Sequence, residues 1–366
     1  MFFSKFWHFV KSFDLILLFS VAIIGSFGLA ALYSIGLGKD PQNFFYLEKQ
    51  AIFFALGFGA LLVVSILNYR LIKNFSIPLY IFSCGSLAAV LLLGTTVRGT
   101  RGWLLAGTFT FQPVEFVKIA LVLALAHYFG RHAWHLSQLR HLVVSGLITA
   151  VPTGLVLLQP DFGSAVVLFS IWVGMVLMNG VSKKYVIGLI VVGIVLFTSA
   201  WFFMFKDYQK DRIRTFIAPT VDQSGRGYNV KQAMIAIGSG QLFGKGIGSG
   251  SQSHLKFLPE NQTDFIFSVI AEEMGLVGIS LLLFFWILFF KRCAHAMKRA
   301  RDDFAVHTVL GFTCMFLAHI IINIGGNLGL VPVTGIVLPF MSYGGSALVS
   351  ALMAVGIIQS ISIHSV

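Results

Sequence analysis

Charged residues are scarce in this sequence, and their scarcity argues against a water-soluble globular protein. Asp, Glu, Lys and Arg make up 11% of the 366 residues, whereas hydrophobic residues make up 57%. Soluble globular chains carry about 25% charged residues, which cover the surface that faces water. A chain with so much apolar surface needs lipid as the solvent for most of its length. We therefore expect an integral membrane protein.

Cysteine is also scarce, which excludes a disulfide framework. Cys84 and Cys314 lie inside apolar runs and Cys293 lies in a basic segment, so no two of them stand where an oxidising compartment would pair them. The spacing of cysteine and histidine matches no zinc motif. The histidines between residues 127 and 141 match no metal motif either, and we expect them at the membrane interface.

Acidic residues are few, and the formal net charge is +12. A nucleic-acid-binding protein concentrates Lys and Arg on one soluble face. Here the basic residues stand between apolar runs, so the sequence predicts no nucleic-acid partner.

Apolar runs of about 20 residues recur along the chain, and this is the length that crosses about 30 Å of hydrocarbon as a helix. The fold class that they predict is an all-α polytopic membrane protein, with residues 1–366 forming a single integral membrane domain. The first run exceeds the ~7–15 residues of a signal-peptide core, so we expect it to remain as a span. The ten expected spans are approximately 13–35, 49–67, 75–94, 113–129, 141–158, 161–179, 185–205, 265–290, 304–326 and 339–363.

The basic residues of the short connecting segments predict the orientation. With a cytoplasmic amino terminus, thirteen Lys and Arg residues fall in short inside segments, and four fall in short outside loops: Lys39, Lys49, Arg98 and Arg101. This positive-inside bias places both termini in the cytoplasm and the long segment 206–264 outside. Helical periodicity in that long loop predicts helices that lie at the bilayer interface, one with Ile213, Phe216 and Ile217 and one with Val230, Ala233, Met234 and Ile237.

Polar residues that packing does not readily explain cluster at the outer ends of the even-numbered spans. They are Gln112, Glu115 and Lys118 on the fourth span, Gln159 and Asp161 on the sixth, Thr263 and Asp264 on the eighth, and Ser342, Gly344, Gly345 and Ser346 on the tenth. Each of these spans begins outside, so its positive dipole end faces the outer leaflet. Together with Arg98, Arg101 and Lys118, the helix starts suit a phosphorylated head group. We expect the four stretches to gather in one charged hollow with Asp264 at its rim.

Each carboxylate has a structural explanation beside the functional one. Glu115 and Lys118 share a helix face, where they form either a self-neutralising pair or a phosphate site. Asp161 follows Pro160 and either caps its helix or faces the site. Asp264 closes a glycine-rich segment that is either an approach path to a ligand or a linker, and it is a candidate general base or metal ligand.

Four segments together resemble the SEDS family (shape, elongation, division and sporulation), which includes RodA and FtsW. They are 111–118 with its Phe-Gln-Pro-Val-Glu start, 159–163 with Gln-Pro-Asp-Phe-Gly, 257–267, and 329–346 with Pro-Phe-Met-Ser-Tyr-Gly-Gly-Ser. Their order and spacing extend the resemblance over nearly the whole chain. The stretch 225–246 is more similar to RodA than to FtsW.

The resemblance implies an inverting peptidoglycan glycosyltransferase in the bacterial inner membrane, active in cell elongation. It would polymerise lipid II, an undecaprenyl-diphosphate-linked disaccharide pentapeptide, into β-1,4-linked glycan at the outer membrane face. The family's essential aspartate falls on Asp264, which would either deprotonate the attacking hydroxyl or help hold a divalent cation, Mg²⁺ or Mn²⁺. No organic cofactor is implied. The expected substrate-binding residues are Glu115, Lys118, Arg98, Arg101, Asp161, Gln112, Thr263, Ser342, Gly344 and Gly345.

The family also implies a partner, a class B penicillin-binding protein that cross-links the strands. The sequence departs from the family pattern at Gly102, where a basic residue usually precedes the tryptophan, so either Arg98 or Arg101 is the candidate for gripping diphosphate. Two other classes of function compete: a flippase for the lipid-linked precursor, and a non-catalytic scaffold of the wall-synthesis complex. A flippase predicts essential residues at both membrane faces, whereas the unexplained polar residues here concentrate outside. A scaffold predicts that Asp264→Ala leaves activity intact.

Overall fold

The computed structural model describes residues 13–38, 41–97, 99–106, 109–132, 138–182, 226–254, 258 and 260–365, with scattered positions between 184 and 210. The expected span at 185–205 is described only at scattered positions, which are helical, and the expected interfacial helix around Phe216 lies outside the described residues. The described helices are α2 (Leu15–Leu37), α3 (Phe45–Ile66), α4 (Tyr69–Leu93), α5 (Val114–Arg131), α6 (Leu139–Leu158), α7 (Phe162–Met178), α10 (Arg226–Ser239), α11 (Ser251–His254), α12 (Ile266–Arg299), α13 (Asp303–Asn327) and α14 (Gly345–His364).

The helices confirm a polytopic all-α membrane protein. Every expected span except the one at 185–205 coincides with a helix. Seven of the helices, α2, α3, α4, α6, α12, α13 and α14, are long and apolar enough to cross a membrane. Helix α7 is apolar but has only 17 residues, and the 18 residues of α5 include Glu115, Lys118 and Arg131.

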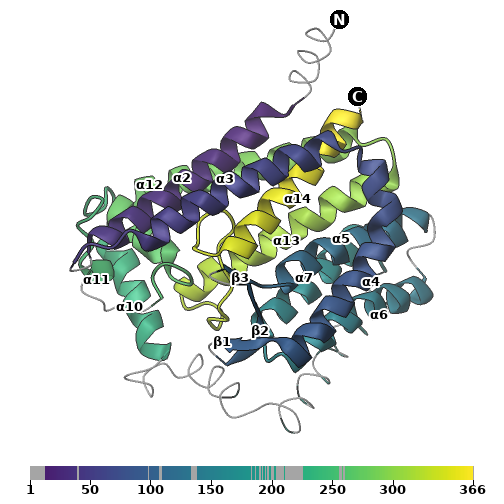
Figure 1. The fold of residues 1–366 in the computed structure, drawn as a ribbon, viewed down its shortest axis with the longest axis horizontal. Coiled ribbons are helices and arrows are strands. Elements are labelled where there is room, and N and C mark those ends of the chain that lie inside the picture. Colours follow the sequence, from purple (N-terminus) through teal and green to yellow (C-terminus); the bar gives the residue numbers. More distant parts are fainter. Residues whose placement is uncertain are drawn as a thin grey trace, which may run out of the picture.

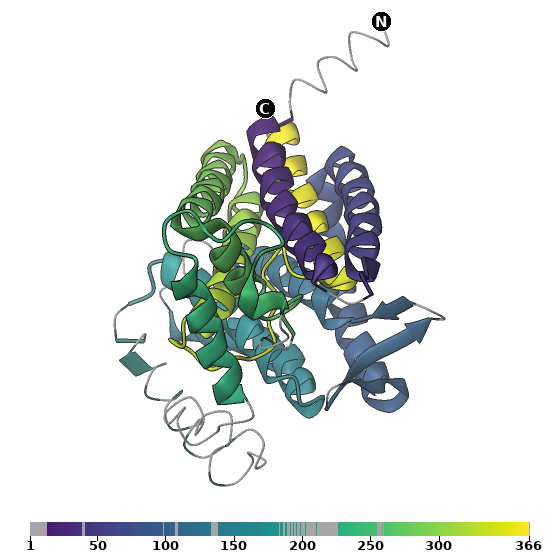
Figure 2. The ribbon, with the colours of Figure 1, turned by 90° about the vertical axis from the view of Figure 1, so that its left-hand side faces the viewer.

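Helices α5, α13 and α14 form the centre of the bundle. Helix α13 packs against α5 and α7, α14 packs against α3, and α12 packs against α2 (Figure 1). Helices α3, α4 and α6 bury only a minor part of their apolar surface, as expected for helices that face lipid. The start of α2 and the end of α14 lie at the same end of the bundle in both views (Figures 1 and 2).

A small antiparallel sheet lies between α4 and α5, and hydropathy did not predict it. Its strands β1 (Thr95–Val97), β2 (Thr100–Ala106) and β3 (Phe109–Phe111) pair in the order β1-β2-β3. The sheet extends beside the helical bundle (Figure 2). The backbone N–H of Arg101 donates a 3.2 Å hydrogen bond to the carbonyl of Gln159, which attaches β2 to the turn between α6 and α7.

Helix α12 is broken at Gly275, whose φ of 62° and ψ of −162° interrupt the helical backbone. A break leaves backbone N–H and C=O groups without helical partners. Segment 241–246 supplies those partners through four hydrogen bonds, from Lys245 N to Glu272 O, Gly246 N to Glu273 O, Leu276 N to Gln241 O and Val277 N to Leu242 O. The backbone approach is so close that a Cβ on Gly244 would lie 2.1 Å from Glu273 O. Gly244 therefore lets the backbone of segment 241–246 come close to α12.

The helix expected around residues 230–237 is confirmed by α10, which packs against α12 and α13. Its buried face is shifted from the expected one. Ala233 and Ala236 are buried, whereas Met234 is 42% exposed. Small side chains on this face let α10 lie close to the helices beneath it.

An irregular segment, which we call the connector (residues 329–344), joins α13 to α14. The last span was expected to begin near residue 339, but α14 begins at Gly345 because residues 339–343 form turns. Leu338, Phe340 and Met341 are buried in the core of the bundle. Non-helical backbone is tolerated in a membrane protein where protein surrounds it, so the connector can form walls of an interior site.

Candidate active site

Asp264 and the pair of Glu115 and Lys118 were expected in one charged hollow, but the structure places them in two different hollows. The connector provides a wall to each of the two. The hollow that we call the lysine pocket is lined by Glu115, Lys118, Met315, Phe316, His319, residues 337–340 and 342 of the connector, and Ala347, Leu348, Ser350 and Ala351 of α14. The hollow that we call the aspartate pocket is lined by Asp264, Ile322, Asn323, Gly326, Asn327 and residues 333–336 of the connector.

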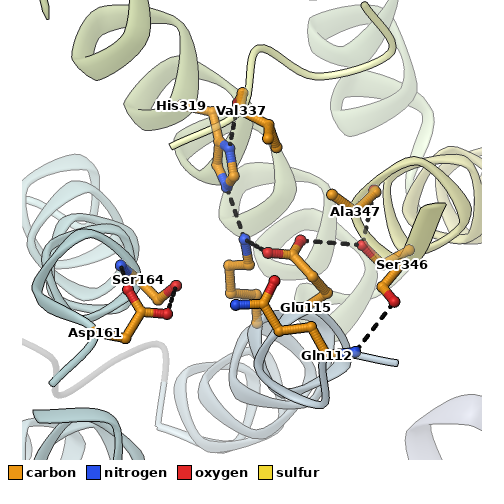
Figure 3. A network of polar contacts seen from close by, with 10 residues as sticks. Gln112, Glu115, Asp161, Ser164, His319, Val337, Ser346 and Ala347 are labelled. Carbon is orange, nitrogen blue, oxygen red and sulfur yellow. Dashed lines mark hydrogen bonds and ion pairs between the residues drawn. The ribbon is translucent and has the colours of Figure 1, made fainter. Parts of the chain in front are cut away.

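A buried charged cluster forms the polar end of the lysine pocket. Lys118 Nζ lies 2.8 Å from Glu115 Oε1 and 3.0 Å from His319 Nε2, and His319 Nδ1 lies 3.1 Å from the carbonyl oxygen of Val337 (Figure 3). Lys118 is only 1% exposed. Glu115 and Lys118 meet because they stand three residues apart on the first turns of α5. The expected pairing is present, and His319 joins it from α13.

The backbone of Asp264 is held by two buried asparagines of α13. Asn327 Nδ2 donates to the main-chain carbonyl of Asp264 at 2.8 Å, and Asn323 Nδ2 donates to the same oxygen at 3.1 Å. Asn327 Oδ1 also accepts a 2.6 Å hydrogen bond from Ser268 Oγ in the first turn of α12. Asp264 itself is half-buried and lines its pocket. These contacts fix the start of α12 against the end of α13.

Three of the four expected stretches are joined by hydrogen bonds. Ser342 Oγ donates to the carbonyl of Thr263 at 2.7 Å, which links the connector to the residue before Asp264. The backbone N–H of Gln112 donates to Ser346 Oγ at 3.1 Å, which links the starts of α5 and α14 (Figure 3).

Two further residues of the tenth-span motif contact α3. The backbone N–H of Gly344 donates to Gln50 Oε1 at 3.3 Å, and Gly345 packs against the ring of Phe53. The motif thereby fixes the connector between α3 and residues 263–264.

Tyr343 follows Ser342 and contacts Tyr46 edge to face, with ring centroids 4.8 Å apart. Burial, with a smaller contribution from Tyr46, raises the pKa of Tyr343 above its ordinary value of 10.0. The ring contact with Tyr46 adds a further attachment of the connector to α3.

The remaining stretch, residues 159–163 at the start of the sixth expected span, adjoins the connector. The carboxylate of Asp161, however, binds Ser164 in its own helix. Asp161 Oδ1 accepts from the backbone N–H of Ser164 at 3.0 Å, and Oδ2 accepts from Ser164 Oγ at 2.7 Å. These are the contacts of a helix N-cap on α7. Gly163 lies against Thr334, so α7 begins beside the connector. No interaction drawn in Figure 3 joins Asp161 to the charged cluster.

Of the two arginines expected to bind diphosphate, the structure describes Arg101. Arg101 is exposed, and its guanidinium donates to the carbonyls of Leu92 at 2.9 Å and Gly94 at 3.1 Å, which lie at the carboxyl end of α4. Arg98 lies outside the described residues.

Metal binding was expected, if at all, at Asp264. Within the part of the chain that the structure describes, no three side chains of His, Cys, Asp or Glu converge on a common point. A preformed site built from three such side chains is therefore not found among the described residues.

The family model of the cell cycle proteins FtsW, RodA and SpoVE matches residues 11–366. The chain belongs to this family. The resemblance inferred from the four sequence segments is thus confirmed.

Relatives in the FtsW/RodA/SpoVE family match most of the chain. It is 37% identical over 324 residues to the peptidoglycan glycosyltransferase MrdB of Escherichia coli K12, covering 88% of this chain and 87% of that protein. It is 31% identical over 359 residues to the stage V sporulation protein E of Bacillus subtilis, covering 96% and 97%.

Solved structures share the fold. One is a chain from work on the structural coordination of polymerization and crosslinking by a peptidoglycan synthase complex, with a TM-score of 0.82 and 29% identity over 96% of this chain and 98% of that one. Another is the rod shape determining protein RodA of Thermus thermophilus, with a TM-score of 0.70 and 28% identity over 96% of each chain.

Proposed function

We propose that this chain is a peptidoglycan glycosyltransferase that polymerises lipid II into β-1,4-linked glycan at the outer face of the cytoplasmic membrane. The observation that carries the proposal is the half-buried Asp264, which lines a pocket while two asparagines hold its backbone. Relatives named as peptidoglycan glycosyltransferases support the reaction class. The positive-inside bias of the sequence supports a cytoplasmic location for both termini.

The chemistry requires one base and a good leaving group. The 4-hydroxyl oxygen of the acceptor sugar attacks the anomeric carbon of the donor, and the carboxylate of Asp264 takes the hydroxyl proton. A new carbon–oxygen bond forms as the bond to the undecaprenyl diphosphate breaks, and the diphosphate leaves with the electron pair. A single displacement inverts an α-linked donor to a β-linked product without a covalent carboxylate intermediate.

The lysine pocket is proposed to bind the charged part of a lipid substrate. The ion pair of Lys118 and Glu115 has no net charge, so it offers directed donors instead of a strong positive field. Lys118 Nζ has three hydrogens, and the contacts found among the described residues use two of them. The third is available for a phosphate oxygen. Gln112, Thr263, Ser342, Gly344 and Gly345 support the walls through the contacts described above.

Arg101 and Asp161 are assigned supporting roles in this proposal. Arg101 donates to carbonyls at the end of α4. Asp161 accepts from a backbone N–H at the start of α7. Arg98 stays a prediction from the resemblance.

A divalent cation fits Asp264 only with help from the substrate. One carboxylate supplies one or two ligands, and Mg²⁺ commonly takes its remaining ligands from phosphate oxygens and water. Mg²⁺ or Mn²⁺ held in this way would neutralise charge on the leaving diphosphate.

A class B penicillin-binding protein is the proposed partner. The support is a similar chain that occurs in a peptidoglycan synthase complex coordinating polymerization and crosslinking. Such a partner would consume the glycan strands by cross-linking their peptides.

Polymerisation of fluorescent lipid II by the purified chain tests the proposal, with and without the cross-linking partner. Parallel arms contain a chelator, added Mg²⁺ or added Mn²⁺. We expect glycan from the wild type and none from Asp264→Ala of equal size-exclusion profile. Unchanged product from Asp264→Ala removes the mechanism. A wild type that makes no product in any arm contradicts the proposed glycosyltransferase function. A dithionite-quenching assay of labelled lipid II in liposomes then separates a flippase from a scaffold.

A further inference from the structure

Helix α13 carries a row of three polar side chains through the core of the bundle. His319, Asn323 and Asn327 stand at i, i+4 and i+8, which places them on one face of the helix. Each is at most 5% exposed. Each binds a main-chain carbonyl outside α13: Val337 O for His319 at 3.1 Å, Ile336 O for Asn323 at 2.8 Å and Asp264 O for Asn327 at 2.8 Å. Buried polar side chains within a membrane span are costly, so these three are candidates for a functional role.

His319 differs from the two asparagines because it also contacts a charged group. Its Nε2 lies 3.0 Å from Lys118 Nζ, on the side opposite the contact with Val337. An ammonium group has donors and no acceptor, so His319 Nε2 must accept. The ring is then neutral, and its proton resides on Nδ1, which donates to the carbonyl of Val337. The two contacts together select a single tautomer.

The position of the Lys118 ammonium therefore depends on two helices. Glu115 holds it from within α5, and His319 holds it from α13. A lysine side chain has four rotatable bonds, so one contact leaves its end mobile, whereas two contacts fix the direction of the third hydrogen. The same His319 ring attaches the connector at Val337, which lines the lysine pocket. The His319 side chain thus fixes both the Lys118 ammonium and the adjacent pocket wall at Val337.

We propose that His319 is a positioning residue for glycan polymerisation, which acts as a neutral acceptor that fixes Lys118 and as a donor that fixes the connector at Val337. This inference rests on the proposed function and deepens it, because the reaction described above uses Lys118 and Asp264 and assigns nothing to His319. His319 is not a base for the attacking hydroxyl, because its accepting nitrogen faces the ammonium.

Two substitutions at residue 319 separate positioning from chemistry. His319→Gln offers an amide oxygen as acceptor and an amide N–H as donor, so it can restore both contacts. His319→Leu fills a similar volume and offers neither. In lipid II polymerisation by the purified chain, we expect His319→Gln to stay within about 3-fold of the wild type. We expect His319→Leu to lose about 10- to 100-fold in kcat/KM, the scale of a hydrogen bond to a charged group.

A double-mutant cycle with Lys118→Met tests whether His319 acts through the lysine. We expect His319→Leu to add less than about 3-fold to the loss caused by Lys118→Met alone, because the group that it positions is already gone. His307→Leu is the matched control, since His307 lies on the same helix but contacts Asn179 and the carbonyl of Asp303. It should leave kcat/KM of the folded protein unchanged. Thermal midpoints of all variants identify losses caused by unfolding.

The outcomes are distinct from those that test the enzyme itself. A wild type without product contradicts the proposed function. With an active wild type, His319→Gln that is as impaired as His319→Leu shows that an imidazole is required, and positioning by hydrogen bonds is overturned. A fully active His319→Leu also overturns it, as does a loss that multiplies with that of Lys118→Met. If His319→Leu does not fold, the activity of His319→Gln decides.

Discussion

Asn327 Nδ2 lies 2.8 Å from the main-chain carbonyl oxygen of Asp264, so the last turn of α13 holds the candidate base by its backbone. Asn327 also accepts from Ser268, and it therefore ties both residue 264 and the first turn of α12 to one side chain. A base that must reach a sugar hydroxyl to within hydrogen-bonding distance benefits from a backbone that cannot shift.

Asn327→Ala should impair polymerisation. The substitution leaves the carbonyl of Asp264 with one side-chain donor and removes the acceptor of Ser268, and we expect it to lower the free energy of unfolding by about 1–3 kcal/mol. In the fraction that stays folded, kcat should fall more than the apparent affinity for lipid II changes. Asn179→Ala is the matched control, because Asn179 contacts His307 near the opposite end of α13. Equal activity losses in both variants would argue against positioning of Asp264.

Substitutions in the ion pair of Glu115 and Lys118 should change stability and activity independently. Lys118→Met leaves a buried carboxylate unpaired, which we expect to lower the free energy of unfolding by about 3–5 kcal/mol. The double variant Glu115→Gln with Lys118→Met removes both charges and should recover most of that loss. Its polymerisation should remain impaired, because the donor to the substrate is absent. Denaturation midpoints and lipid II turnover measure the two effects, and a stable double variant of normal activity would assign the pair a structural role alone.

Gly244→Ala should weaken the contact between segment 241–246 and the break in α12, and so destabilise the protein. Gly244 has a φ of +77°, and a Cβ there would meet the carbonyl of Glu273 at 2.1 Å, so segment 241–246 would have to withdraw from α12. We expect a loss of at least about 2 kcal/mol in the free energy of unfolding. Gly238→Ala is the control, since nothing lies within 4 Å of a Cβ at that position of α10. Thermal midpoints in detergent that coincide for both variants would contradict a stabilising contact between segment 241–246 and α12.

Asp161 offers a test between a helix cap and a substrate contact. Serine is as good an N-cap as aspartate, so Asp161→Ser should keep both the stability and the polymerisation activity of the wild type. Asp161→Ala should lower the free energy of unfolding by about 1 kcal/mol. An Asp161→Ser variant with an unchanged melting temperature and a strongly reduced turnover would show instead that its carboxylate serves the substrate.

Sequence reasoning found the apolar helices because hydrophobic length is a local property of the chain. It placed Glu115, Lys118 and Asp264 at the ends of spans, where the structure has them. The break at Gly275 and the irregular connector escaped it, because partners distant in sequence satisfy their backbone groups. The sheet at residues 95–111 falls in a loop too short for hydropathy to describe.

The polar row on α13 also escaped sequence reasoning, although a signal was present. His319, Asn323 and Asn327 recur every four residues within an apolar run, and that spacing predicts one buried polar face. What those side chains contact could not be predicted, because each partner belongs to another segment of the chain.

The most direct test of the account is the turnover of lipid II by Asp264→Asn, which keeps the shape of the side chain and removes its basicity. The substitution preserves the main-chain carbonyl that Asn323 and Asn327 hold, so the fold and the binding of lipid II should be unchanged. We predict a loss of about 10²–10⁴ in kcat with an unchanged thermal midpoint, the usual contribution of a general base. Turnover within a few-fold of the wild type would contradict the claim that this carboxylate drives polymerisation.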